Sequence, residues 1–275
     1  AITFGGAIGG GTPLTGLTVN SKAALGLPAV TVTGNLVVES GAGITQTAAL
    51  GVGGNADFTA PGGASIILGE ANTFSGTVSF LSPGTLAAVT VRDTTALDLE
   101  ALTLTGNLSV TSGGNITQSG VLNIGGTSDF TLNSGTTDIT LGSGNTFANT
   151  ITFTNNGNIR DLSFRKAAGA AAFPALPAGL RNLTVVWNTG FVLPSGSFTG
   201  IMSLSAGGAV TQAAGGIQAA SLLLLGTGPY TLTEAANDVD TLAVNTTEAV
   251  SFRDTDDLIV ETVLTTNGIT TTGDN

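Results

Sequence analysis

Cysteine and histidine are both absent from this chain of 275 residues, and only 9% of its residues are charged. The absence of cysteine excludes disulfide bonds and thiolate metal sites. The absence of histidine removes the commonest general base and excludes a Ser-His-Asp triad. With seven Lys and Arg residues and a net charge of -11, the chain cannot neutralise many phosphates. We therefore expect no nucleic-acid partner.

Long hydrophobic runs are also missing. No apolar run reaches the roughly 18 residues that a membrane helix needs, so we expect no membrane insertion. The opening AITFGGAIGGGTP has neither a basic start nor a continuous apolar core, so we expect no signal peptide in it. Acidic residues outnumber basic ones by 18 to seven, and half of the acids lie in the last 45 residues. Most of this charge is expected to solvate the surface.

The most informative feature is an internal repeat. Residues 34–58 read GNLVVESGAGITQTAALGVGGNADF, and residues 106–130 read GNLSVTSGGNITQSGVLNIGGTSDF, at a constant offset of 72. A diverged third copy carries Thr211 where the second carries Thr117, an offset of 94. We therefore predict one repeat domain, 1–275, with copies at about 34–105, 106–199 and 200–275 and an inserted rung near 166–197.

Strand signals dominate between the turns. Apolar residues alternate with Thr, Ser and Asn over short segments, and 41 glycines separate them. This pattern favours an all-β, right-handed parallel β-helix of about 11–13 rungs, with about 22–25 residues in each rung and about three rungs in each 72-residue repeat. An antiparallel sandwich is the alternative, but it prefers Asn-Gly hairpin turns, which occur only at 156–157 and 267–268.

These phrases carry a resemblance to a known family. GNLSVTSGGNITQSGVLNIGG, the later SGNTFANTITF and a Val-Arg-Asp-Thr segment resemble the repeat region of filamentous-haemagglutinin-like exoproteins and related β-strand-repeat adhesins of bacteria. The resemblance covers most of the chain and is weakest from about 160 to 198. It implies a secreted right-handed β-helical shaft used in adhesion or biofilm formation. No site residue of the family can be transferred to this sequence.

Acidic side chains provide one candidate site. Asp254, Asp256 and Asp257 cluster beside Arg253, and hard carboxylate oxygens are the ligands that Ca²⁺ prefers. The same cluster is the best candidate for polysaccharide chemistry, which needs grouped carboxylates. However, the Arg-Asp pair occurs three times, at 92–93, 160–161 and 253–254, which favours a structural role in a turn or an ion pair.

Two further groups are candidates for contact surfaces. Trp187 and Tyr230 are the single residues of their types, and they either pack in the core or offer a platform for a glycan. The stretch KAAGAAAFPALPAGLRN at 166–182 interrupts the strand pattern, and its two prolines forbid a long helix. It is either a decorated loop or a lateral self-association surface formed by Phe173, Leu176 and Leu180, which are costly to leave in water.

Together these observations predict a secreted bacterial structural or adhesive protein, located outside the cell or on its surface. We expect a β-helical shaft segment or filament subunit that stacks end to end on copies of itself and attaches to surface glycans or a host surface. We expect no enzyme activity and no cofactor apart from the candidate Ca²⁺. The alternatives are a glycan-binding adhesin domain and a polysaccharide-active β-helix enzyme.

Overall fold

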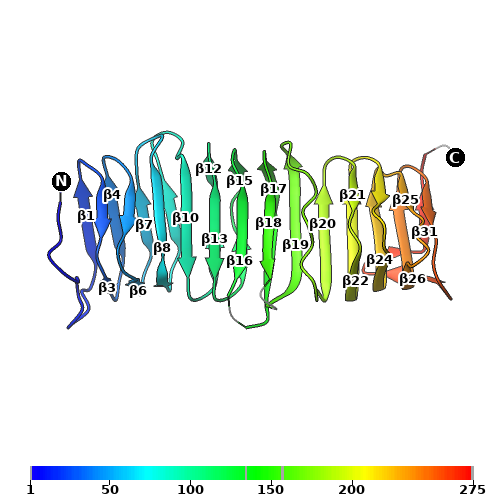
Figure 1. The fold of residues 1–275 in the computed structure, drawn as a ribbon, viewed down its shortest axis with the longest axis horizontal. Helices are drawn as coiled ribbons and strands as arrows, with labels where there is room; N and C mark the ends of the chain where they lie inside the picture. The colour runs from blue at the N-terminus through cyan, green and yellow to red at the C-terminus, as the bar shows by residue number, and fades with distance from the viewer. Residues whose placement is uncertain (1, 134, 156–157, 274–275) are drawn as a thin grey trace.

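The chain coils into an elongated stack of strands in a computed structural model that describes residues 2–133, 135–155 and 158–273. These residues form 31 strands and no helix, so they contain no helix able to cross a membrane. The strands make a parallel β-solenoid of about 12 turns, with the first and last described residues at opposite ends (Figure 1). The predicted all-β parallel β-helix is therefore confirmed.

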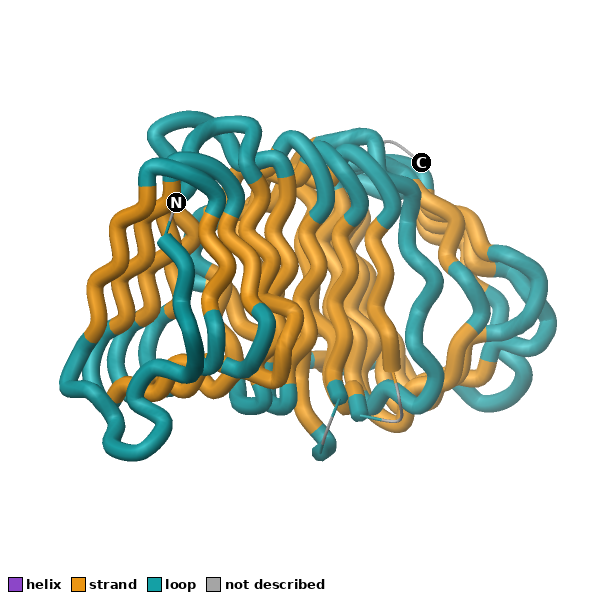
Figure 2. Tube along the Cα trace, turned by 60° about the vertical axis from the view of Figure 1, so that its left-hand side comes forward, coloured by secondary structure: helices purple, strands orange, loops and turns teal. Residues whose placement is uncertain are grey.

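Four parallel sheets run along the stack. The first comprises β1 (Leu17–Ser21), β4 (Leu36–Ser40), β7 (Ala56–Thr59) and β9 (Val78–Leu81). The second comprises β2 (Leu25–Leu27), β3 (Val30–Val32), β5 (Ile44–Gln46), β6 (Leu50–Val52), β8 (Ser65–Phe74), β10 (Ala88–Asp93), β13 (Leu108–Ser112), β16 (Ser128–Leu132) and β18 (Ile151–Asn155). Figure 2 shows successive strands side by side, with loops at the corners.

The remaining strands continue the same arrangement. The third sheet comprises β11 (Leu97–Leu99), β12 (Leu102–Leu104), β14 (Ile116–Gln118), β15 (Leu122–Ile124), β17 (Thr137–Phe147), β19 (Ile159–Ala168), β20 (Asn182–Trp187), β22 (Gly196–Ala206), β24 (Ile217–Gly226), β26 (Asp238–Thr246), β28 (Ile259–Val260) and β31 (Ile269–Thr271). The fourth comprises β21 (Phe191–Leu193), β23 (Val210–Gln212), β25 (Tyr230–Leu232) and β27 (Val250–Phe252).

One pair of strands differs from the rest. Among the described residues, only β29 (Thr262–Val263) and β30 (Thr266–Asn267) pair in the antiparallel sense. Asn267 ends this hairpin and Gly268 follows it, so the Asn-Gly pair at 267–268 does not form its turn. The pair at 156–157 lies outside the described residues. The antiparallel sandwich alternative is therefore excluded for the body of the fold.

The relation between rung and repeat differs from the prediction. Ile44 pairs with Ile66, Ile66 with Val89, and Val89 with Leu108, so three rungs lead from Ile44 to Leu108. The repeat counterpart of Ile44 is instead Ile116, which lies on the next strand of the chain, in a different sheet. One repeat is thus three full rungs plus the step to the strand on the next face of the solenoid. It exceeds three rungs because rungs such as the one from Val89 to Leu108 are shorter than predicted.

The Gly-Asn dipeptides explain how one rung turns against the next. Asn107 Oδ1 accepts the backbone N–H of Thr127 on the following rung at 2.9 Å, and Asn35 does the same for Asn55 at 3.0 Å. The turns lie so close that a Cβ on Gly126 would stand 2.5 Å from the carbonyl carbon of Gly106. Glycine is therefore required by the backbone of the neighbouring rung.

Inward side chains fill a single core that extends along most of the stack. Leu, Val and Ile alternate with outward Thr and Ser, as in β13 with its buried Leu108 and Val110. Aromatic rings stack from rung to rung, with centroids 6.2 Å apart for Phe58 and Phe80 and 5.7 Å apart for Phe130 and Phe153. Because each rung is too thin to enclose a core, this stacking supplies the burial that holds it.

The close approach of the turns gives a first prediction. Gly126→Ala should lower the free energy of unfolding by about 2 kcal/mol or more, because the methyl group meets backbone that has no room to move. Gly142→Ala is the matched control, since no atom lies within 4 Å of the added Cβ. Urea unfolding followed by circular dichroism measures both variants, and equal effects would contradict the steric explanation.

Candidate functional site: corner amides and an outer polar ladder

A buried amide pair occupies one corner of the solenoid. Asn72 is fully buried where the long strand β8 bends, and its Oδ1 accepts the side-chain N–H of Gln46 at 2.8 Å and the backbone N–H of Leu50 at 2.8 Å. Its Nδ2 donates to Gln46 Oε1 at 3.0 Å and to the carbonyls of Leu68 and Arg92. One side chain thus satisfies the backbone of three successive rungs, where the bend leaves sheet hydrogen bonds unmade.

The same pair recurs in the other two copies. Gln118 and Asn145 exchange the same two side-chain hydrogen bonds, as do Gln212 and Asn237. Each asparagine also accepts a backbone N–H and donates to a carbonyl four or five residues earlier and to a carbonyl of the next rung. The repeated Ile-Thr-Gln phrase is therefore one half of a structural corner. The sequence shows the glutamine in this phrase and Asn145 in the phrase SGNTFANTITF, but not that the two side chains, 25 to 27 residues apart, pair with each other.

Asp93 pairs with Asn72 on the next rung, so the two side chains occupy equivalent positions one above the other. Its side chain is 1% exposed, and its Oδ1 accepts the backbone N–H and the hydroxyl of Thr95, both at 2.9 Å, which holds the predicted turn. Its Oδ2 is buried without a hydrogen-bond partner. Burial raises the pKa of Asp93, and the hydrogen bonds from Thr95 only partly oppose this effect.

Lys166 occupies the equivalent column position above Asn145. Its ammonium group lies 4.5 Å from the centroid of the Trp187 ring and donates to Asn188 Oδ1 at 3.2 Å. Burial lowers the pKa of Lys166. The aromatic face and the amide oxygen both favour the charged form, so this cation is held by weak contacts and not by an ion pair.

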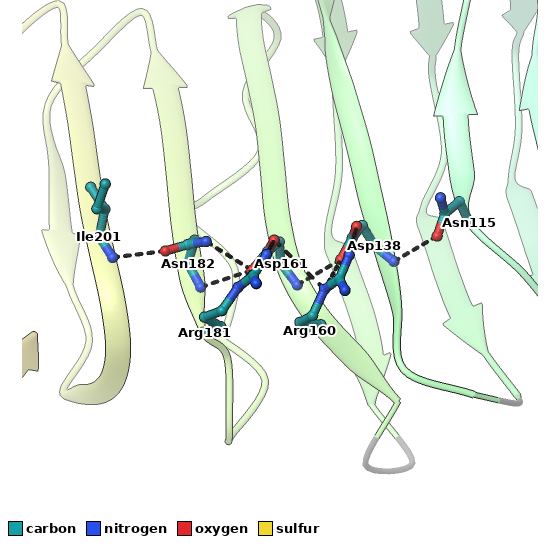
Figure 3. Close-up of polar contacts among 7 residues, drawn as sticks. All are labelled: Asn115, Asp138, Arg160, Asp161, Arg181, Asn182 and Ile201. Atoms are coloured by element: carbon teal, nitrogen blue, oxygen red, sulfur yellow. Dashed lines mark hydrogen bonds and ion pairs between the residues drawn. The ribbon is translucent and has the colours of Figure 1, made fainter. Parts of the chain in front are cut away.

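An outer polar ladder crosses five rungs on one face. Asn115 Oδ1 accepts the backbone N–H of Asp138 at 3.0 Å, Asp138 accepts that of Asp161 at 3.2 Å, and Asp161 accepts that of Asn182 at 3.1 Å (Figure 3). Asn182 in turn accepts the N–H of Ile201 at 2.8 Å. Each of the four side chains stands just before a strand or within its first three residues. Each accepts one backbone N–H from the following rung, so the ladder fixes the register of this face.

Two arginines flank the ladder. Arg160 bonds to Asp138 through two nitrogens, and Arg181 bonds to Asp161 in the same forked manner (Figure 3). The hydrogen bond from Arg181 lowers the pKa of Asp161. Because the arginine side chains are 41% and 49% exposed, water screens these pairs and their contribution to stability is small. The Arg-Asp pair at 160–161 is thus used in an ion-pair network, as its recurrence suggested.

The predicted calcium cluster does not form a cation site. Asp254 Oδ1 accepts the backbone N–H of Val239 at 3.0 Å, whereas Asp256 and Asp257 are exposed. In the described part of the chain no three Asp or Glu residues lie close enough to hold a metal ion. The pKa of Asp256 is raised, first by lost hydration and then by repulsion from Asp238 and Asp254. Asp254 therefore shapes a corner, and the other two carboxylates share a crowded acidic rim.

The two predicted glycan platforms are in the core. Trp187 is 2% exposed and Tyr230 is 1% exposed, so neither ring has a face open to a sugar. The Tyr230 hydroxyl accepts the N–H of Ala206 at 3.0 Å and lies 2.7 Å from the carbonyl oxygen of Leu225, and burial raises the pKa of Tyr230. The alternation that ends β20 already signals this burial, because Trp187 follows Leu183 and Val185 at every second position.

The predicted lateral surface also packs inward. Leu180 is 1% exposed, and Phe173 and Leu176 are partly buried against the main core. The Phe173 ring stacks on Phe191 with centroids 4.3 Å apart and contacts Trp187 at 5.3 Å. These side chains take the place of core residues in the segment between β19 and β20, which forms no strand, so they are not free for a partner.

The corner amide pair generates a prediction about stability. Asn145→Ala should lower the free energy of unfolding by about 3 to 5 kcal/mol, because it leaves Gln118, a backbone N–H and two carbonyls without partners. Asn123→Ala is the control, since Asn123 is exposed on the neighbouring strand β15. Urea unfolding of both variants measures the difference, and an equal loss would show that the amide pair contributes little.

The buried carboxyl group generates a prediction about pH. Because the pKa of Asp93 is raised in the folded state, the unfolded chain releases this proton first, and folding is weakened as pH rises from about 4. Asp93→Asn should therefore gain stability relative to the parent at pH 7, and the gain should shrink towards pH 4 and below. Urea unfolding between pH 3.5 and 7 tests this, with the exposed Glu70→Gln as control. A gain that does not change with pH would contradict the assignment.

Comparison with known families is consistent with this repeat geometry. A family described as "Repeats of unknown function (DUF5649)" matches residues 14–81, 86–154 and 180–247. The three matches start 72 and 94 residues apart, the same offsets that separate the repeated phrases. No curated protein and no solved structure shows significant similarity to the chain. Because the matches cover most of its length, the chain belongs to this family of repeats of unknown function.

Proposed function

We propose that this chain is a shaft segment of a secreted bacterial structural protein, which extends by stacking end to end and attaches to surfaces without catalysis. The observation that carries the proposal is the parallel ladder, which continues through the stack and ends in strands with an open edge around an apolar cavity. The resemblance to filamentous-haemagglutinin-like shafts supports a location outside the cell or on its surface.

The open edge lies at the end formed by β27, β28 and β31. Its cavity has a volume of about 420 Å³ and is lined mainly by Leu242, Val244, Val250, Phe252, Leu258, Val260 and Ile269. Val260 is 48% exposed and Ile269 is 53% exposed. A further rung would cover these side chains and pair with the free strand edges, as every internal rung does. A second copy of the chain supplies such a rung at its β1 end.

Charge favours one polarity of stacking. Lys22 is the only charged side chain before Glu39, whereas nine of the 18 acids and a single base lie after Tyr230. Two β27 ends in contact would bring their acidic rims together, at a cost in repulsion. The β1 end carries almost no charge, so it meets the acidic end without this cost. The result is a head-to-tail contact, which propagates into a filament because it does not close on itself.

The sides of the shaft suit attachment through many weak contacts. Outward positions are mainly Thr, Ser, Asn and Gly, as in β3, β5 and β12, and they repeat from rung to rung. Surface glycans or a host surface are the proposed partners, because hydroxyl and amide groups in a regular array can form many hydrogen bonds, each of small net energy. Attachment then depends on the number of contacts and not on a single pocket.

Electron microscopy of the purified chain tests the stacking. We expect unbranched filaments with an axial repeat of about 58 Å, from about 12 rungs at roughly 4.8 Å each. Ile269→Asp should abolish the filaments, because it places a charge in the apolar contact. Val192→Asp is the control, since Val192 is 57% exposed but lies on the side of the stack in β21.

Two outcomes would contradict the proposal. Single rods at every protein concentration would show that the open edge does not accept a second copy. Filaments that persist in Ile269→Asp would show that assembly uses another surface.

A further inference from the structure

A hairpin leaves the last rung and folds back along its side. Ile259 and Val260 of β28 pair with Thr241 and Leu242, whereas β31 pairs with Val244–Thr246 of the same strand, β26. Eight residues, 261–268, therefore connect β28 to β31 where β26 has only Ala243 between its paired residues Leu242 and Val244, so they leave the ladder. They form the hairpin β29–β30, which lies against β26 and, through β29, β24. We call residues 261–268 the side strap.

The side strap covers apolar residues that face outward. In β24, Leu222 and Leu224 point into the main core, so Leu223 points to the outside, yet it is only 3% exposed. Ala243, its partner on β26, is fully buried for the same reason. Val263 of the side strap packs on both and is itself 3% exposed. Ile201 and Leu225 flank this second, small core, which is separate from the main one.

The tip of the side strap reaches further along the stack. Leu264 lines a cavity of about 240 Å³ together with Ile201, Asn182 and Asp161, so the tip faces the outer polar ladder across this cavity. The side strap thus lies against β26 and β24, and Ile201 of β22 packs against the small core that it covers. This contact is different in kind from the rest of the fold, where a rung touches only its immediate neighbours.

The attachment of the side strap is weak. Its two strands share two residue pairs, and a two-stranded hairpin has little stability of its own. Leu264 has a φ of 54°, a conformation that strains a leucine, and it is 62% exposed. Val263 is the one side chain of the strap that is buried. The strap therefore has fewer anchoring contacts than any rung that it covers.

We propose that the side strap is a releasable clamp, which couples the rungs from β22 to β26 and whose detachment is the first opening of the fold. While attached, it holds rungs that are not neighbours in the stack, so their local opening requires its release. Once detached, it exposes the outward apolar stripe formed by Leu223, Ala243, Ile201 and Leu225. These side contacts of the strap do not depend on end-to-end stacking.

Hydrogen exchange followed by mass spectrometry tests the clamp in the full chain. Val263→Ser should speed exchange about tenfold or more in β24, β26 and β31, because it removes the buried anchor. Amides of β13 and β16, in the middle of the stack and away from the strap, should exchange at the parental rate and serve as an internal standard. Leu223→Ser, which removes the anchor's partner, should produce the same pattern.

The neighbouring position supplies the control. Leu264→Asn changes an exposed side chain at a conformation that asparagine tolerates, so it should leave exchange in β24 and β26 unchanged or slower. Parental exchange rates in both serine variants would overturn the proposal. So would acceleration in β13 and β16 to the same extent, since it would indicate global destabilisation and no local clamp.

Discussion

Backbone hydrogen bonding between successive rungs is the interaction on which this structure depends. A single rung encloses too little apolar surface to fold alone, so each gains its stability from the rungs above and below. The turns and the core are both arranged so that successive rungs can approach closely enough to form these hydrogen bonds. Glycines let the turns approach, as at Gly126, and inward residues form continuous columns, as Phe130 and Phe153 do. The uniformity of the strands follows from the same requirement.

The corners are the places where this fold lacks backbone hydrogen bonds, because strands that bend there leave N–H and C=O groups unpaired. Two solutions appear. Inside, the amides of Asn72, Asn145 and Asn237 each satisfy groups on several rungs. Outside, Asn115 and its successors each accept one N–H from the next rung. Both use short polar side chains, either uncharged, as in Asn145, or paired with an arginine, as in Asp138.

The fold class could be predicted from the sequence because alternation and the repeat offset are local or repetitive signals. The rung length could not, because it changes from rung to rung with the loops at the corners. For the same reason Asn145 could not be recognised as the partner of Gln118, because the pairing depends on where the chain returns. For Trp187 the sequence left core packing and a glycan platform open, and for Phe173 a loop and a contact surface, because neither residue shows from the sequence which rings it will meet; in the fold the two rings pack together in the core.

The length of the repeat also determines how the surface is displayed. Because one repeat is three rungs plus one face, equivalent residues such as Ile44 and Ile116 do not lie above one another but on successive faces. Successive copies of an outward group are therefore rotated about the axis of the solenoid relative to one another. A solenoid built in this way presents the same chemistry in several directions around its axis and not along a single side.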